Sequence, residues 1–403
     1  MRALSRVHSI MGIFLLTTCE ALAQSPSLTV CQILADPLAY NGKIVRVSAP
    51  IVHGFEEFQI QGESCGQEVN AIWLTYPESG DGKAGPVASL TLRLSKNNPH
   101  ARGTATRAQP IKLNQDKNFK SLDRYLAETY KPKRGEICLG CPRYTVRATL
   151  TGRLDAVEKA GFTRDSFGVI TAIQGFGNLN RYRARLVLQS VTEVAADQID
   201  YSKKIEPQIS GEGLKQSSSG ETVVAGDPVQ ALRSAASRLK PGGFQQVRIS
   251  DAAKAFGEQG EENGVVVGFG RASAANDVPT ADPNSPDGVV FQATFDVDKL
   301  KGTALAVAIA HVGTHIADFR SPRMRAAPNR LSGFSFEWRA WQTSILAAET
   351  FGEGRVILPE GTLAWSGAWK PDAVSSLADR AITEFVMRVS GLKESSPHDP
   401  WSN

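Results

Sequence analysis

The sequence predicts an α+β protein with two dissimilar parts, and three observations support this. Apolar or β-branched residues alternate with polar ones over residues 44–76, 144–154 and 182–194, as in strands with one buried face. After residue 227, longer runs with helical spacing are mixed with short β-rich runs. Residues 201–226, a polar stretch rich in Gly and Ser, lie between the two parts as a linker. The chain of 403 residues, 41% apolar and 21% charged, has globular composition and is long enough for two domains.

Residues 1–23 have the pattern of a cleaved secretion signal. A basic start is followed by the short apolar run Ile10–Thr18 and by the small residues of Ala-Leu-Ala at 21–23. The run is too short to span a bilayer, which needs about 20 apolar residues. We therefore expect a secreted or periplasmic protein that begins at Gln24 and has no transmembrane segment. The alternative is lipidation of Cys19, but lipidation sites carry Gly, Ala or Ser before the cysteine, where this chain has threonine.

Four cysteines remain after the signal, all in the first half: Cys31, Cys65, Cys138 and Cys141. An even number in an oxidising compartment predicts two disulfides. Of the three pairings, we favour Cys31 with Cys65 and Cys138 with Cys141. A four-cysteine zinc site is an alternative, but the chain has only one CxxC pair. A thioredoxin-like redox pair would need to open a helix, whereas a proline and a strand-like run follow this pair.

The first predicted domain, residues 27–200, is rich in strands. Helical patterns are confined to Ser27–Ala35 and Leu122–Tyr130. Five or so strands with a helix fit a small OB-like barrel. A Tyr-Asn-Gly-Lys turn, the run VRVSAPIVHGFEEFQI, a cysteine and IWLTYP are similar to an uncharacterised domain of secreted bacterial proteins. That resemblance implies fold and localisation only.

A basic stretch, residues 93–134, interrupts these strands. It holds eleven Lys or Arg and three acidic residues. We expect a solvated loop here, with polyanion binding as the alternative. The aromatic residues on which single-stranded nucleic acids stack are sparse, and the formal net charge of the chain is only +4. We therefore expect no nucleic-acid partner.

The second predicted domain, residues 227–392, mixes helices and strands and precedes a polar tail, residues 393–403. Asp227 is placed to cap a helix that has proline at its first position. This helix should end at Lys240. The further elements predicted are strands at Gly264–Gly268 and Val289–Asp296, and helices at Leu300–Phe319, Phe334–Phe351 and Pro371–Val389.

Two histidines lie four residues apart in the second half, in the sequence His311-Val-Gly-Thr-His315. The residues before them are apolar and compatible with a helix, on which positions i and i+4 share one face. Glu337 follows 22 residues after His315. Two histidines and a glutamate from a second helix are a common zinc ligand set that leaves a fourth position for water. The alternative is that the histidines are buried, hydrogen-bonded residues of a core helix.

The runs LAVAIAHVGTHIADF and FSFEWRAWQ resemble zincin metallopeptidases, which have an HExxH helix and a downstream glutamate helix. In particular they resemble bacterial proteins with the pattern HEGTHxAD, over about residues 245–350. The resemblance implies that His311, His315 and Glu337 bind zinc. It also implies that Asp318, one turn after His315, is a partner of a zinc ligand.

One departure from this pattern bears on function. The family has glutamate after the first histidine, where it serves as the general base, and this chain has Val312. In addition, no tyrosine follows Tyr201, so the oxyanion lacks a common partner. We therefore expect a catalytically inactive, zinc-binding domain that acts as a binding or scaffold module for an unknown protein or peptide. The alternatives are an active zinc metallopeptidase with a non-standard base such as Asp318, and a polyanion-binding protein that uses residues 93–134.

Overall fold

The computed structural model describes residues 27–63, 65, 69–77, 82–101, 110–133, 136–166, 169–201, 227–257, 264–270, 285, 288–321, 333–352, 355–358, 361–364 and 382–387. Helices and strands are both present, which confirms the predicted α+β class. The predicted signal, the tail and all of the predicted linker except Tyr201 lie outside these ranges. Of the last predicted helix, residues 382–387 are described and are helical.

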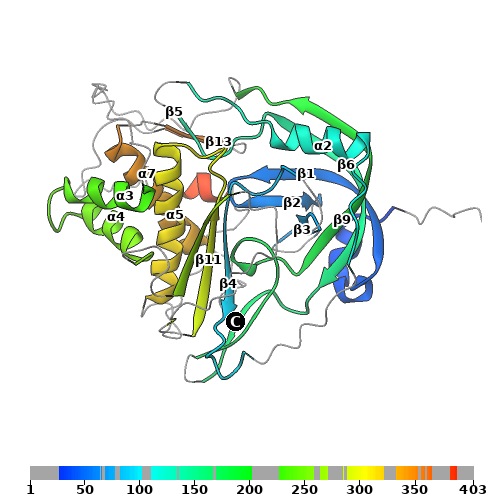
Figure 1. Cartoon of the computed structure of the whole chain (residues 1–403), viewed down its shortest axis with the longest axis horizontal. Coiled ribbons are helices and arrows are strands. Elements are labelled where there is room, and N and C mark those ends of the chain that lie inside the picture. Colours follow the sequence, from blue (N-terminus) through cyan, green and yellow to red (C-terminus); the bar gives the residue numbers. More distant parts are fainter. Residues whose placement is uncertain are drawn as a thin grey trace, which may run out of the picture.

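Five strands of the first half form a closed ring (Figure 1). Each strand pairs with the next in the order β1-β2-β3-β9-β6, and β6 pairs back with β1. The β3–β9 pair is parallel and the other pairs are antiparallel. The strands are β1 (Ile44–Gly54), β2 (Glu57–Gln61), β3 (Ala71–Thr75), β6 (Tyr144–Ala156) and β9 (Ala184–Gln198).

Burial alternates along β1, as the period-two pattern predicted, whereas all five residues of β3 are buried. Aliphatic and aromatic side chains fill the ring. Helix α1 (Val30–Ala35) begins at Thr29, whose hydroxyl accepts from the Gln32 amide. Helix α2 (Lys117–Ala127) packs on β6 and β9, and the carboxylate of Asp116 caps its first turn. It begins earlier than the predicted helical segment because Asp116 supplies the N-cap.

The second half builds a helical layer against a three-stranded sheet (Figure 1). Strand β10 (Val265–Phe269) runs parallel to β11 (Val289–Phe295). Helix α5 packs on β11, on α4 and on α7, so it lies at the centre of this half. The helices are α3 (Pro228–Ser237), α4 (Phe244–Lys254), α5 (Thr303–Arg320) and α7 (Gly333–Thr350).

The predicted elements of this half that lie wholly in the described ranges are confirmed within a few residues, including the Asp227 cap, whose carboxylate accepts from the Val229 amide. Helix α4 was not predicted. Its buried residues are only Ile249, Ala252 and Ala253, so its sequence has little apolar periodicity.

Two strands of the first half belong to sheets of the second. Strand β4 (Ala88–Leu94) pairs antiparallel with β11. Strand β5 (Glu136–Cys138) pairs parallel with β12 (Arg355–Leu358), which pairs with β13 (Gly361–Ala364). The predicted boundary at the linker therefore does not separate two independent sets of paired strands.

The basic stretch, residues 93–134, contains the end of β4 and all of α2, so the prediction of a solvated loop is wrong for these parts. The short elements that remain are η1 (Pro37–Tyr40), β7 (Gly161–Arg164), β8 (Ile170–Gln174) and η2 (Asn178–Asn180). Strands β7 and β8 form a hairpin in the long connection between β6 and β9.

The four cysteines pair as favoured. Cys31 bonds to Cys65 with a Cα–Cα distance of 4.9 Å, and Cys138 bonds to Cys141 with a Cα–Cα distance of 5.6 Å. The first bridge ties α1 to the segment after β2, and the second lies at the end of β5. None of the helices in the described ranges is long and apolar enough to cross a membrane.

Candidate metal centre

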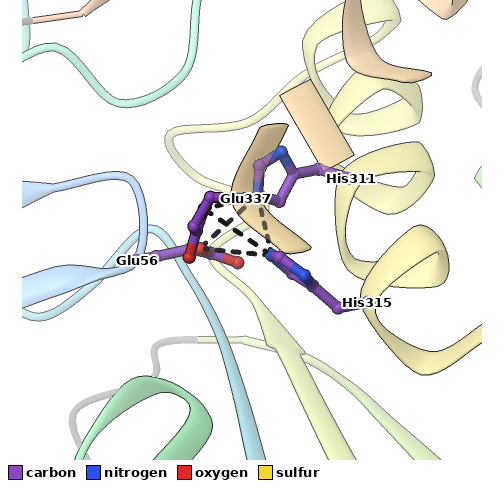
Figure 2. Close-up of side chains that lie close together, drawn as sticks. All are labelled: Glu56, His311, His315 and Glu337. Carbon is purple, nitrogen blue, oxygen red and sulfur yellow. Dashed lines mark hydrogen bonds and ion pairs between the residues drawn. The ribbon is translucent and has the colours of Figure 1, made fainter. Parts of the chain in front are cut away.

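Four side chains from three separate elements point toward one another: Glu56, His311, His315 and Glu337 (Figure 2). One donor atom of each lies within 4.8 Å of the corresponding atoms of the others. Both histidines are 0% exposed and both glutamates 5% exposed. The structure thus brings together the three predicted residues and adds Glu56, which the sequence analysis missed.

The two histidines lie one turn apart on α5, and their Nε2 atoms are 3.0 Å from each other. Gly313, between them, lets α5 approach α4 closely. A Cβ atom at this position would clash with the backbone carbonyl of Ala252 on α4. The glycine of the motif therefore fixes the face of α5 that packs on α4, while the histidines lie on the face toward the barrel.

The hydrogen bonds of His311 define its tautomer. Its Nδ1 lies 3.1 Å from the Ser344 hydroxyl, and that hydroxyl donates to the Ala340 carbonyl at 3.0 Å. A serine hydroxyl has one hydrogen, so the Ser344 oxygen must accept from Nδ1–H of His311. The lone pair of Nε2 is then directed toward the other three side chains, as a metal ligand requires.

His315 is held by packing. Its ring stacks on Phe336 with centroids 4.6 Å apart. Its Nδ1 is buried and has no hydrogen-bond partner among the described residues. Only Nε2 of this ring therefore faces polar groups.

The two carboxylates lie at similar distances from the histidines. Glu337, on α7, places Oε2 at 3.8 Å from His311 Nε2 and 3.9 Å from His315 Nε2. Glu56 places Oε2 at 3.5 Å and 4.0 Å from the same two nitrogens. The two glutamates are thus nearly equivalent, although one comes from the helix predicted to carry a ligand and the other from the barrel.

Glu56 is in the tight turn between β1 and β2, and its backbone is unusual. Its φ is 59°, in the left-handed region that non-glycine residues rarely adopt. The preceding Phe55 packs edge-on against His311, at 5.0 Å, and against Trp341, at 5.6 Å. A buried glutamate in a strained turn is typical of a position kept for function.

Burial dominates the electrostatics of the site. It lowers the pKa of His311 to about 4 against the effect of Glu337, and together with His311 it lowers the pKa of His315 to about 3. Both histidines are therefore neutral near pH 7. Burial and the neighbouring Glu56 raise the pKa of Glu337 to about 7. Burial also raises the pKa of Glu56, despite His315 and Arg181. Two close carboxylates resist joint ionisation, and a divalent cation between them would relieve this repulsion.

The predicted partner of a zinc ligand, Asp318, has another role. Its carboxylate accepts two hydrogen bonds from Arg339, at 2.6 and 2.7 Å. The pair lines a cavity of about 450 Å³ that also includes Arg248, Thr314 and Arg320. Asp318 thus pairs with Arg339 of α7, and among the described residues the Nδ1 atoms of the two histidines do not use it: that of His311 contacts Ser344 and that of His315 has no hydrogen-bond partner. Val312 is fully buried in the apolar core around α5.

The geometry of the four donors fits one small cation. Four ligands at 2.0–2.1 Å in a tetrahedron lie about 3.3 Å from each other. Five of the six donor–donor distances run from 3.0 to 4.0 Å, and the sixth, between the two carboxylates, is no more than 4.8 Å. Shifts of about 1 Å would therefore place all four donors around an ion. Two imidazoles with two carboxylates suit a first-row transition cation better than magnesium or calcium. The group could therefore hold a metal ion.

No protein-family model matches the chain, and neither a curated protein nor a solved structure is significantly similar to it.

Proposed function

We propose that the protein is an exported zinc-binding protein with an inactive zincin-like domain, in which zinc joins the barrel to helices α5 and α7. The position of Glu56 is the observation that carries this proposal. It lies near the position that the resemblance to zincins leaves for water, at distances from the histidines that match those of Glu337. A fourth protein ligand is typical of structural zinc sites, whereas catalytic sites keep one position open.

Val312 supports the same conclusion. A general base must accept a proton, which an aliphatic side chain cannot do. The residue is packed among apolar neighbours on α5 and is 0% exposed. The site of the resemblance thus lacks both the base and an open metal position.

The order of the strands in the ring, and the place of helix α2 after β3 and before β6 in the sequence, support an OB-like barrel. In OB domains the loops after the first and fourth barrel strands contribute to ligand binding. Here the first of these loops carries Glu56, and the second carries Arg181, which lies 3.6 Å from Glu337. The chain's own helices thus cover the edge where an OB domain would bind an oligonucleotide. We propose that the partner is a protein or a peptide, not a nucleic acid.

Export is supported by the two disulfides, because such bonds persist in oxidising compartments. In a reducing cytoplasm these thiols would be kept free.

Metal analysis of protein purified without chelators tests the proposal. We expect about one zinc per chain, and its loss in His311→Ala and in Glu337→Ala. His100→Ala is the matched control, because His100 is an exposed histidine outside the group of four. Protein that contains no zinc, and takes none up in equilibrium dialysis, would contradict the proposal.

A second candidate function is a zinc hydrolase in which Glu56 is the base. The raised pKa of Glu56 and its approach to His311 favour this reading over Asp318, whose carboxylate is bound by Arg339. Glu56→Gln separates the two candidates. A ligand role predicts weaker zinc binding in this variant, whereas a base role predicts retained zinc and lost peptide cleavage.

A further inference from the structure

One short segment of the barrel half, Asn178 to Arg181, lies against both glutamates of the group. It comprises η2 and the residue after it, in the connection between β8 and β9. Leu179 and Asn180 both have φ of 55°, so the segment adopts a conformation that is held by its surroundings.

Two asparagine side chains anchor the segment to the sheet of the second half. Asn178 Oδ1 accepts from the Leu90 amide at 2.7 Å, and Asn180 Oδ1 accepts from the Leu92 amide at 2.8 Å. Both amides belong to β4, so the asparagines supply acceptors along the edge of this strand. The segment is therefore fixed relative to the sheet on which α5 packs.

Arg181 reaches one oxygen of Glu337. Its guanidinium Nη1 lies 3.6 Å from Oε1, and its Nη2 donates to the Tyr182 hydroxyl at 3.3 Å. The side chain is 14% exposed, so this charge is largely shielded from water. Both contacts of Glu337 with the histidines use Oε2 instead. The arginine thus forms an ion pair with one carboxylate oxygen, while the other oxygen faces the histidines.

Asn178 lies beside Glu56 as Arg181 lies beside Glu337. Its Oδ1 is used by β4, so its remaining polar atom is the donor Nδ2. Asn178 is 0% exposed, and its amide opposes the rise in the pKa of Glu56 that burial causes. Nδ2 of Asn178 and Oε1 of Glu56 are both buried, and neither makes a hydrogen bond of good geometry among the described residues, which leaves a buried donor and a buried acceptor to satisfy each other. Glu56 also contacts the histidines through Oε2.

We infer that Arg181 and Asn178 are positioning residues that hold both glutamates as one-oxygen ligands and so make the site selective for a four-coordinate cation. This inference rests on the proposed metal site. Two imidazoles and two single oxygens satisfy tetrahedral zinc. Calcium takes six to eight oxygens, often from bidentate carboxylates, and magnesium and manganese favour six oxygen ligands. A glutamate whose second oxygen is occupied cannot supply that additional ligand.

The test compares zinc and manganese binding to the whole mature protein by competition with a chromophoric chelator. Arg181→Met should lower the ratio of zinc to manganese affinity by about tenfold to a hundredfold, the usual effect of losing an outer partner of a metal ligand. If Arg181 acts only through its charge, Arg181→Met will strengthen the binding of zinc and of manganese equally. The ratio of the two affinities would then be unchanged, which would overturn the inference.

Asn178→Ala and Asn180→Ala are a matched pair. Each removes one acceptor from β4, but only Asn178 faces Glu56. We expect similar losses of thermal stability in both variants and a reduced zinc-to-manganese ratio only in Asn178→Ala. Equal zinc-to-manganese affinity ratios in the two variants would contradict the proposed role of Asn178. This pair also keeps the test decisive if Arg181→Met does not fold.

The absorption spectrum of the cobalt-substituted protein is an independent measurement. Tetrahedral Co²⁺ gives strong visible bands, which weaken when the coordination number rises. We expect strong bands in the wild type and in Asn180→Ala, and weaker bands in Arg181→Met and Asn178→Ala. A wild type that binds no cation would refute the proposed metal site itself. A wild type that binds zinc, with all variants unchanged in ratio and spectrum, would refute only the inference about Arg181 and Asn178.

Discussion

The carboxylate of Glu56 lies 3.5 Å from the imidazole of His311, although these residues come from opposite halves of the chain. The contact joins the turn between β1 and β2 to the central helix α5 (Figure 2). It is also an arrangement that is unfavourable without a cation, since the carboxylate is buried, close to Glu337 and held at a positive φ. The stability of the protein should therefore depend on the metal.

Glu56→Asn should have opposite effects on the metal-free and the zinc-loaded protein. Asparagine tolerates positive φ better than glutamate and brings no buried charge. Relief of a backbone strain of about 1–3 kcal/mol should raise the melting temperature in chelator. With zinc, the same variant should melt below the wild type because one ligand is gone. Calorimetry in both conditions measures this, and a variant that is destabilised equally in both would show that Glu56 serves packing and not metal.

Zinc should raise the melting temperature of the wild type. A ligand that binds only the folded state adds about 2.7 kcal/mol of stability at a concentration 100 times its dissociation constant. His315→Ala should abolish the increase, while His100→Ala should retain it. An equal increase in both variants would place the bound metal elsewhere.

The sequence was informative where the determining interactions are local. Asp227 followed by proline marks the start of α3, and the apolar runs around His311 and Glu337 mark α5 and α7. The candidate metal-binding histidines could be predicted because two histidines four apart share a helical face wherever the helix packs.

The remaining features depend on packing between distant segments. Strand β4 has its partners in β11, and nothing near residues 88–94 indicates this. Glu56 is one of several acidic residues at strand ends, and its role appears only when the turn that carries it meets α5. Asp318 has the spacing of a ligand partner but pairs with Arg339, which lies on the facing helix α7 and presents a guanidinium that matches a carboxylate.

The stability of the metal-free protein should depend on pH through the two histidines and the two glutamates, which act in opposite directions. The pKa values of His311, about 4, and His315, about 3, lie below the ordinary 6.5, so the unfolded state binds more protons between these values and stability falls as pH is lowered through that window. The pKa of Glu337, about 7, lies above the ordinary 4.5, so its contribution to stability is lost as pH rises from 4.5 to 7. The raised pKa of Glu56 acts in the same direction as that of Glu337.

In chelator, the glutamates therefore oppose the histidines between pH 4.5 and 6.5. Glu337→Gln removes the contribution of Glu337, whose pKa of about 7 lies above this window. As pH falls through the window, the stability of the variant should therefore change less favourably than that of the wild type by about 1.4 kcal/mol per pH unit, which is the effect of one proton. Urea unfolding at several pH values measures the slope. Identical slopes for wild type and variant would mean that these groups do not titrate as their burial indicates.

The last prediction concerns catalysis. The wild type should show no more than trace cleavage of a peptide library, even when loaded with zinc. Bound zinc can lower the pKa of a coordinated water to about 7, but in the proposed site Glu56 is the fourth ligand and takes the place of that water. Positioned proton transfer, which Val312 cannot provide, usually contributes 10²–10⁴-fold, or about 3–5 kcal/mol of barrier.

Variants can separate the effect of the missing base from the effect of the filled fourth metal position. Val312→Glu adds a carboxylate on α5 but leaves the fourth position filled, and Glu56→Ala opens that position without adding a base. Each single variant should remain inactive, and the double variant should be the most active of the set, provided that cobalt spectra show an occupied site. Because Val312 is fully buried, each variant must first be shown to melt cooperatively. Zinc-dependent cleavage by the wild type that survives in Val312→Ala but disappears in both His311→Ala and Glu56→Gln, with zinc retained in the latter, would contradict the inactive-domain proposal. It would identify Glu56 as a general base supplied by the barrel.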